Sequence, residues 1–260
     1  MREILQKVAE GKMSIDEAER ALKFNAIETI AGVARLDVGR TVRRGVPEII
    51  LAEGKSTDDL VSICTRMLEK NGRTIISRAN EEQLKRLKNS FPQHKIEQPS
   101  HAKAIVISKA NSERQTTGGR VGILTAGTVD LAVAEEASMI AREMGCETHL
   151  EVDAGVAGIH RLVEPLGRMV EKDVDSLIVV AGREGALPTV VAGLVDIPLI
   201  AVPASSGYGY GGKGEGALMA MLQACSLGLA VVNIDSGIAA GVVAAQIANR
   251  AARARQTGIR

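Results

Sequence analysis

Two residues in the second half of the chain have side chains that could carry covalent or proton-transfer chemistry. Cys225 follows an apolar helical segment and precedes a turn, where its thiolate could act as a nucleophile. Glu184 lies between Gly182 and Gly185 after an aliphatic segment, where a carboxylate has no evident structural role and could transfer protons. Because a single cysteine is more often a small buried apolar residue than a nucleophile, these residues alone leave the reaction open.

A series of short aliphatic segments must position these residues. The segments are typical of buried parallel strands, and a helix-compatible stretch follows each of them. They span 121–126, 147–152, 176–181, 198–203 and 229–234, and the stretches after them begin near residues 130, 160, 186, 213 and 236. The pattern predicts an α/β domain in which a parallel sheet lies between two helical layers. Ligands of such sheets bind outside the carboxyl ends of the strands, so the loops there should form the site.

Of the 27 glycines of the chain, 21 lie from Gly118 onward, and 12 of these fall in the loops that follow the strands. Glycine lets a turn adopt positive φ and lets backbone approach a ligand, while free N–H groups at helix starts favour anions. The concentration of glycine therefore favours a phosphate-bearing ligand, although tight turns alone would account for some of these positions. Neither a GxGxxG motif after the first strand nor a GxxxxGK[ST] motif is present.

Other polar residues in the same loops are weaker candidates. Thr128 and Asp130 straddle the first turn, where they could equally cap a helix. His160 and Arg161 open the second helix, where such a pair is commonly inert but would again face the ligand. No His, Cys and Glu residues have the spacing of a metal site, so any metal ligands remain unknown.

The first half of the chain also alternates helices and strands. Capping signals at Ser14 and Asn80 predict helix starts, and the polar, turn-rich run 111–119 predicts a linker. We expect a smaller N-terminal α/β domain over 1–115 and the parallel-sheet domain over 120–260. Helices are expected at 4–8, 58–70, 81–88 and 238–248, and strand-like apolar segments at 30–36, 48–52, 74–77 and 104–108.

Composition excludes several classes of function. The net charge is +1, and two Phe, two Tyr and no Trp leave few rings on which bases could stack. We therefore expect no nucleic-acid partner. The three cysteines lie far apart, which argues against a disulfide framework and favours the cytoplasm, and no apolar segment is long enough to predict a membrane span.

The motifs of the second half resemble those of the PurE-like enzymes, which carboxylate or isomerise an aminoimidazole ribonucleotide. The similar segments are AGTVD, IHR, VVAGREGALPTVVAG, IPLIAVPASSGYG and ALMAMLQACSLGLAVVNIDSG. Three features point to the LarB family within this group: EGALP where the purine enzyme has His-Leu-Pro, the stretch ending in Cys225, and LDVGRTVRRGVPEIILAEGK over 36–55. The resemblance covers nearly the whole chain and implies a three-layer α/β/α, PurE-like (Rossmann-like) C-terminal domain.

The resemblance also implies an activity. LarB-type enzymes carboxylate the pyridinium ring of nicotinic acid adenine dinucleotide at C5, using CO2 or bicarbonate, and hydrolyse its phosphoanhydride. The products are pyridinium-3,5-biscarboxylic acid mononucleotide and AMP, which begins the synthesis of the nickel-pincer nucleotide cofactor. Cys225 matches the nucleophile that adds transiently to the ring, and Glu184 would remove the ring proton or handle the thiol proton. No tightly bound cofactor is implied, although Mg²⁺ would suit phosphoanhydride cleavage.

The same resemblance assigns binding roles and partners. It implies a homo-oligomer, of eight subunits, and downstream proteins of the nickel-pincer pathway as partners. Two residues of this sequence differ from the family pattern. Val129 stands where the family commonly has Ser, and Gly39 stands where many relatives have His. Substrate and phosphate contacts are expected from Gly127, Thr128, Asp130, His160, Arg161, Gly182, Ser206, Gly207, Tyr208 and Asp235, with Arg40, Arg44 and Lys55 as candidates in the N-terminal domain.

Two alternatives stay open at this point. A PurE-type aminoimidazole ribonucleotide carboxylase or mutase would need a histidine in the Glu184 loop and would leave Cys225 and the N-terminal domain unexplained. A non-catalytic nucleotide-binding regulatory module would bind the dinucleotide without consuming it.

Overall fold

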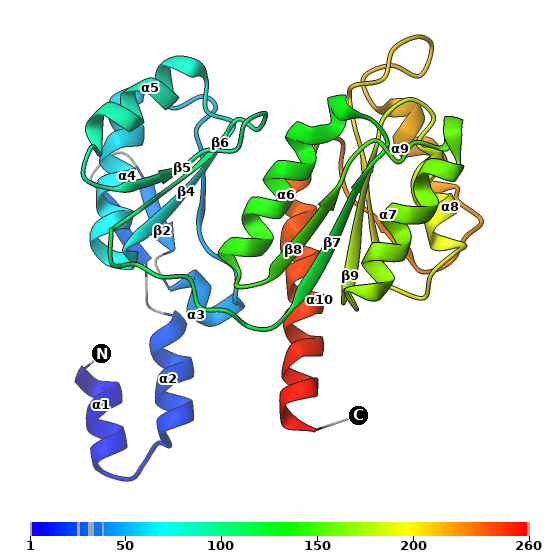
Figure 1. Cartoon of the computed structure of the whole chain (residues 1–260). Helices are drawn as coiled ribbons and strands as arrows, with labels where there is room; N and C mark the ends of the chain where they lie inside the picture. Colours follow the sequence, from blue (N-terminus) through cyan, green and yellow to red (C-terminus); the bar gives the residue numbers. More distant parts are fainter. Residues whose placement is uncertain (1, 25–26, 31–33, 38, 259–260) are drawn as a thin grey trace. The chain divides into compact units, whose positions relative to one another are not determined.

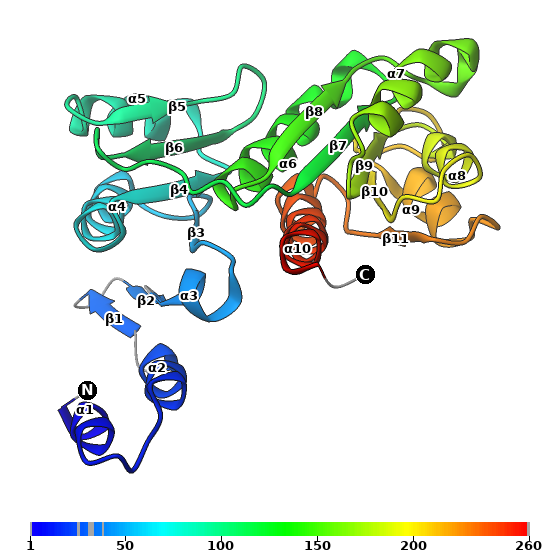
Figure 2. The same ribbon diagram turned by 60° about the horizontal axis from the view of Figure 1, so that its bottom comes forward.

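The structure is a computed structural model that describes residues 2–24, 27–30, 34–37 and 39–258. The chain forms two compact units (Figures 1 and 2). One comprises Met1–Gln98 with Lys103–Ser112, and the other comprises Pro99–Ala102 with Glu113–Arg260.

The second unit is built on a five-stranded parallel sheet. Its strands are β7 (Arg120–Thr125), β8 (Glu147–Glu151), β9 (Ser176–Ala181), β10 (Leu199–Pro203) and β11 (Leu229–Val231). They are ordered β8-β7-β9-β10-β11, with every neighbouring pair parallel. The five predicted strands are confirmed, although β11 ends three residues earlier than expected. All residues of β9 and β10 are buried, which explains their uninterrupted aliphatic sequences.

Helices cover both faces of this sheet, which confirms the predicted three-layer α/β/α fold (Figure 1). On one face, α7 (His160–Glu171), α8 (Ala186–Ala192) and α9 (Glu215–Leu222) bury apolar side chains against the strands. On the other face lie α6 (Leu131–Glu143) and α10 (Gly237–Thr257). The short 3₁₀ turns η1 (Thr128–Asp130) and η2 (Val156–Gly158) precede α6 and α7.

Small residues allow α6 and α10 to pack closely. A Cβ atom on Gly237 would lie 2.2 Å from the Val133 carbonyl oxygen, and one on Gly241 would lie 2.6 Å from that of Ala137. Helix α10 continues nine residues beyond its predicted end at residue 248. In the described part of the chain, no helix is both long and apolar enough to span a membrane.

The first unit contains a smaller, mixed sheet. Its strands are β3 (Ile49–Leu51), β4 (Arg73–Ser77), β5 (Lys95–Glu97) and β6 (Ala104–Ser108), in the order β3-β4-β6-β5. Only the β3–β4 pair is parallel. Helices α4 (Thr57–Asn71) and α5 (Glu81–Ser90) contribute to its apolar core.

The rest of this unit consists of short elements. Helices α1 (Arg2–Ala9), α2 (Ile15–Phe24) and α3 (Arg40–Arg44) accompany an antiparallel pair, β1 (Ile27–Ile30) and β2 (Ala34–Asp37). The predicted strand-like segment 30–36 therefore falls on β1 and β2, with 31–33 outside the described residues. The capping box at Ser14 is confirmed, because the Glu17 N–H donates to Ser14 Oγ and the Ser14 N–H donates to the Glu17 carboxylate.

Candidate active site

A cleft of about 730 Å³ opens at the carboxyl ends of β7 and β9. Strand order reverses between these two strands, because β8 lies on one side of β7 whereas β9, β10 and β11 follow on the other. Such a reversal is where open α/β sheets bind their ligands, and the volume suits a small molecule. The cleft is lined by Ala126, Gly127, Val129, Asp130, Gly155, Val156, Ala157, Arg161, Ala181, Gly182, Arg183, Glu184, Ala186, Leu187, Ser206 and Tyr208.

Asp130 joins two of the loops that form the cleft. It is 2% exposed, and its carboxylate accepts hydrogen bonds from the Gly127 N–H (2.9 Å) and from Ser206 Oγ (2.7 Å). Burial raises the pKa of Asp130, the two hydrogen bonds oppose that rise, and the nearby Asp235 carboxylate adds to it. The side chain therefore fixes the loop after β7 against the loop after β10.

Two glycines allow the loops after β9 and β10 to interlock. A Cβ atom on Gly182 would lie 2.4 Å from Ser206 Oγ, and one on Gly207 would lie 2.8 Å from the Arg183 backbone nitrogen. A side chain at Gly207 would therefore force the backbone to move, and one at Gly182 would displace the Ser206 hydroxyl that binds Asp130.

Glu184 is an exposed carboxylate at the wall of the cleft. It also lines a smaller neighbouring cavity of about 330 Å³, together with Arg183 and Tyr208. The Arg183 guanidinium lies 4.2 Å from the centre of the Tyr208 ring, as in a cation–π contact. Sequence reasoning missed Arg183, although it belongs to the same loop as Glu184.

The remaining predicted residues of the second unit lie at or beside the cleft. Arg161 lines it and forms an ion pair with Asp153 (2.9 Å). Asp235 accepts a hydrogen bond from the Ser205 N–H (2.8 Å), in the loop after β10. Thr128 and His160 are exposed at the starts of η1 and α7 and are not among the residues that line the cleft.

Cys225 lies at the opposite edge of the sheet. Helix α9 begins after the carboxyl end of β10, and the chain then returns to the amino end of β11. Gly228, three residues after Cys225, accepts a hydrogen bond through its carbonyl from the N–H of Leu199, the first residue of β10. This bond places the Cys225 segment near the amino ends of the strands. The first and last residues of β10 are roughly 13 Å apart, at about 3.3 Å per residue. Cys225 lines neither cavity that contains Glu184, so one copy of the chain does not bring the two together.

Cys225 is nevertheless the accessible thiol of the chain. It is exposed, whereas Cys64 and Cys146 are buried. Burial raises the pKa of the Cys64 thiol to about 12 and that of Cys146 to about 11, so both remain protonated and unreactive at neutral pH. Large exposed apolar side chains flank Cys225 in the sequence: Met219, Leu222 and Leu227 are 61%, 66% and 90% exposed.

The three basic candidates of the N-terminal half lie in the first unit. Arg40 forms an ion pair with Glu48 (3.1 Å), and Arg44 is exposed at the end of α3. Lys55 lines a separate pocket of that unit. Across the described residues, no group of three or more His, Cys, Asp and Glu side chains is arranged to hold a metal ion.

Comparisons with known proteins agree with this architecture. Residues 27–109 match the LarB/PurE-like N-terminal domain, and residues 120–259 match the AIR carboxylase family. An uncharacterised protein of Methanocaldococcus jannaschii is 42% identical over 253 residues, which cover 95% of this chain and 96% of that protein.

Several N5-carboxyaminoimidazole ribonucleotide mutases match about half of this chain. The N5-carboxyaminoimidazole ribonucleotide mutase of M. jannaschii is 34% identical over 127 residues (48% of this chain, 76% of the enzyme), and that of Thermotoga maritima is 28% identical over 129 residues (49% and 74%). The chain therefore belongs to the AIR carboxylase (PurE-like) superfamily, as a LarB-like member with the matching N-terminal domain.

Proposed function

We propose that this protein carboxylates the pyridinium ring of nicotinic acid adenine dinucleotide at C5 and hydrolyses the phosphoanhydride, using CO2 or bicarbonate as co-substrate. The products are pyridinium-3,5-biscarboxylic acid mononucleotide and AMP, and the reaction would begin nickel-pincer nucleotide synthesis. The LarB-like N-terminal domain and the AIR carboxylase family support this assignment over other carboxylation substrates. The observation that carries it is Glu184, an exposed carboxylate in the cleft at the carboxyl ends of β7 and β9.

A thiol is needed because a pyridinium carbon is too electron-poor to attack CO2. In the proposal, the Cys225 thiolate adds to the ring and converts the cation into a neutral dihydropyridine, whose enamine carbon C5 forms the new bond to CO2. Glu184 then removes the proton from C5, and the electron pair restores the aromatic ring as the thiolate leaves. The thiolate is regenerated, and a separate attack of water on the phosphoanhydride releases AMP.

The position of Cys225 supports a site shared between two copies of the chain. Cys225 and Glu184 lie at opposite edges of one sheet, so we propose a homo-oligomer in which Cys225 of one copy reaches the cleft of another. Exposed Met219, Leu222 and Leu227 support this arrangement, because apolar side chains left on a surface commonly mark a protein interface.

Mixed oligomers test whether the two residues act across copies. Cys225→Ser and Glu184→Gln chains should each be inactive alone. If the site combines Glu184 of one copy with Cys225 of another, random mixing restores both groups in about a quarter of the sites. Co-expressed variants should therefore recover about that fraction of wild-type AMP release. Complete inactivity of the mixture, in oligomers of wild-type size, would contradict a shared site.

A further inference from the structure

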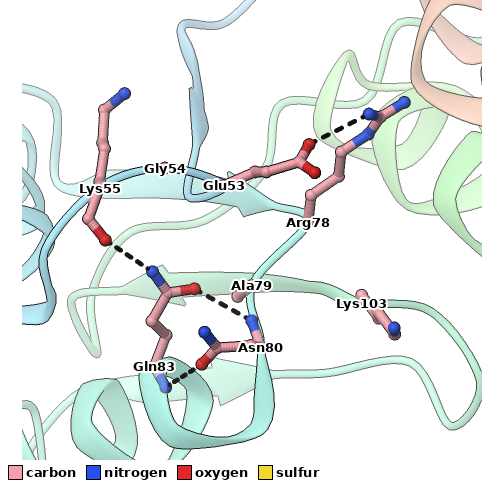
Figure 3. Close-up of a pocket in the computed structure, with 8 residues that line it drawn as sticks. All are labelled: Glu53, Gly54, Lys55, Arg78, Ala79, Asn80, Gln83 and Lys103. Carbon is pink, nitrogen blue, oxygen red and sulfur yellow. Dashed lines mark hydrogen bonds and ion pairs between the residues drawn. The ribbon is translucent and has the colours of Figure 1, made fainter.

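A second pocket, unrelated to the cleft, lies in the first unit at the carboxyl ends of β3 and β4. Its volume is about 420 Å³, within the range of small-molecule sites. β3 and β4 are the parallel pair of this sheet, so the loops that follow them emerge on the same side. The pocket is lined by Glu53, Gly54, Lys55, Arg78, Ala79, Asn80, Gln83 and Lys103 (Figure 3).

The base of the pocket is held in place by Gln83. This side chain is 4% exposed, and its amide nitrogen donates to the carbonyls of Ala52 (3.1 Å) and Lys55 (3.0 Å). Its amide oxygen accepts from the Asn80 N–H (3.0 Å), while Asn80 accepts from the Gln83 N–H (2.8 Å) and caps helix α5. One buried amide therefore fixes both loops, and the pocket is formed before any ligand binds.

Positive charge dominates the lining. Lys55, Arg78 and Lys103 come from three separate segments, and Figure 3 shows Lys55 on one side and Arg78 and Lys103 on the other. The one carboxylate among the lining residues, Glu53, pairs with Arg78 (3.2 Å). Within the described residues, neither Lys55 nor Lys103 forms an ion pair. The pocket therefore presents two cations that no carboxylate of its lining pairs, while Glu81 and Glu82 occupy the first turn of α5 beside it.

The backbone at Arg78 points to the same conclusion. Its φ is 52°, in the left-handed region that residues with side chains rarely adopt and that glycine adopts freely. An exposed pair with Glu53 contributes little to stability, so it does not account for an arginine there. Such conformations cluster at functional sites, and Arg183 beside the cleft has one as well, with a φ of 54°.

We propose that this pocket binds a small phosphorylated metabolite through its phosphate group, with Lys55, Arg78 and Lys103 as the cationic contacts. A phosphate drawn into this pocket would find charge-assisted donors from three segments of the chain. The volume leaves room for the organic part of a phosphate monoester beyond the phosphate itself.

Photoaffinity labelling of the full-length protein with 8-azido-AMP tests the proposal. We expect saturable labelling that mass spectrometry maps to peptides containing residues 53–55, 78–83 or 103. AMP should compete with the probe and adenosine should not. Inorganic phosphate that competes as well as AMP would identify free phosphate as the ligand, whereas weaker competition would identify a phosphate ester.

Two substitutions and a matched control complete the test. Arg78→Gly relieves the positive φ, and together with Lys103→Gln it should weaken labelling at least about tenfold without loss of folding. Lys88→Gln removes one exposed charge from the last turn of α5, away from the pocket, and should change nothing. Labelling confined to residues 120–260, equal competition by adenosine, or wild-type labelling of the double variant would overturn the proposal. None of these outcomes depends on whether the protein carboxylates a pyridinium ring.

Discussion

Replacing Ser206 by alanine would remove the hydroxyl that ties the β10 loop to the β7 loop. Ser206 Oγ donates to the Asp130 carboxylate over 2.7 Å, and Asp130 is 2% exposed. A hydrogen bond to a charged acceptor contributes about 1.5–3 kcal/mol, and its loss leaves a buried oxygen without a donor. We expect Ser206→Ala to lower the free energy of unfolding of the second unit by about 2 kcal/mol at neutral pH.

This loss should depend on pH. Burial raises the pKa of Asp130, and the Ser206 hydroxyl opposes that rise, so the pKa should be higher still in the variant. At pH values below both pKa values the carboxyl group is protonated and the hydroxyl matters little. As pH rises above the Asp130 pKa of the wild type, the wild-type carboxylate ionises and gains the hydrogen bond from Ser206, which the variant lacks. The difference in the free energy of unfolding therefore grows with pH and reaches its full value above the higher pKa of the variant.

Urea unfolding would report on this unit alone through the fluorescence of Tyr208, because its contact with Arg183 is lost on unfolding, both tyrosines lie in this unit, and the chain has no Trp. Ser226→Ala is the matched control, because its hydroxyl donates to a neutral carbonyl, that of Thr189, over 2.8 Å. The control should lose about 1 kcal/mol at every pH. A Ser206→Ala loss that equals the control and stays constant with pH would refute the role given to Asp130.

Helix packing and thiol chemistry provide two further predictions. Gly241→Ala places a Cβ 2.6 Å from the Ala137 carbonyl oxygen and should destabilise the unit by about 1–3 kcal/mol. Gly167→Ala, where a Cβ would have no atom within 4 Å, should instead stabilise the unit by about 0.5–1 kcal/mol. Shifts of the same sign for both variants in urea unfolding would contradict this. Iodoacetamide should modify Cys225 in the folded protein and should reach Cys64 and Cys146 only after denaturation, because burial raises the pKa of both. Peptide mapping that found either buried thiol alkylated at the rate of Cys225 would contradict the burial argument.

The parallel sheet could be predicted from sequence because its strands are buried on both faces and are therefore continuously aliphatic. Strand β5 could not be predicted, since Lys95–Glu97 is short and largely polar and has no apolar pattern. The length of α10 was underestimated because its apolar face ends near Ala252, while the last turns continue with polar residues as far as Thr257.

The site was predictable to the extent that topology determines it. Residues after the strands meet at one edge of a parallel sheet, which placed Asp130, Glu184 and Ser206 together. The Ser206–Asp130 hydrogen bond depends on loop conformations that no sequence pattern specifies. The separation of Cys225 from Glu184 could also have been predicted. Cys225 lies between a helix and the next parallel strand, and such a residue lies at the amino edge of the sheet, whereas Glu184 follows a strand at the carboxyl edge.

Incubation of the purified protein with nicotinic acid adenine dinucleotide and ¹³C-bicarbonate, followed by mass spectrometry, tests the central claim most directly. We expect AMP together with a pyridinium mononucleotide that carries one labelled carboxyl group, and no turnover by Cys225→Ser. Turnover of N5-carboxyaminoimidazole ribonucleotide with the dinucleotide left intact would contradict the proposed function, as would full activity of the Cys225→Ser variant.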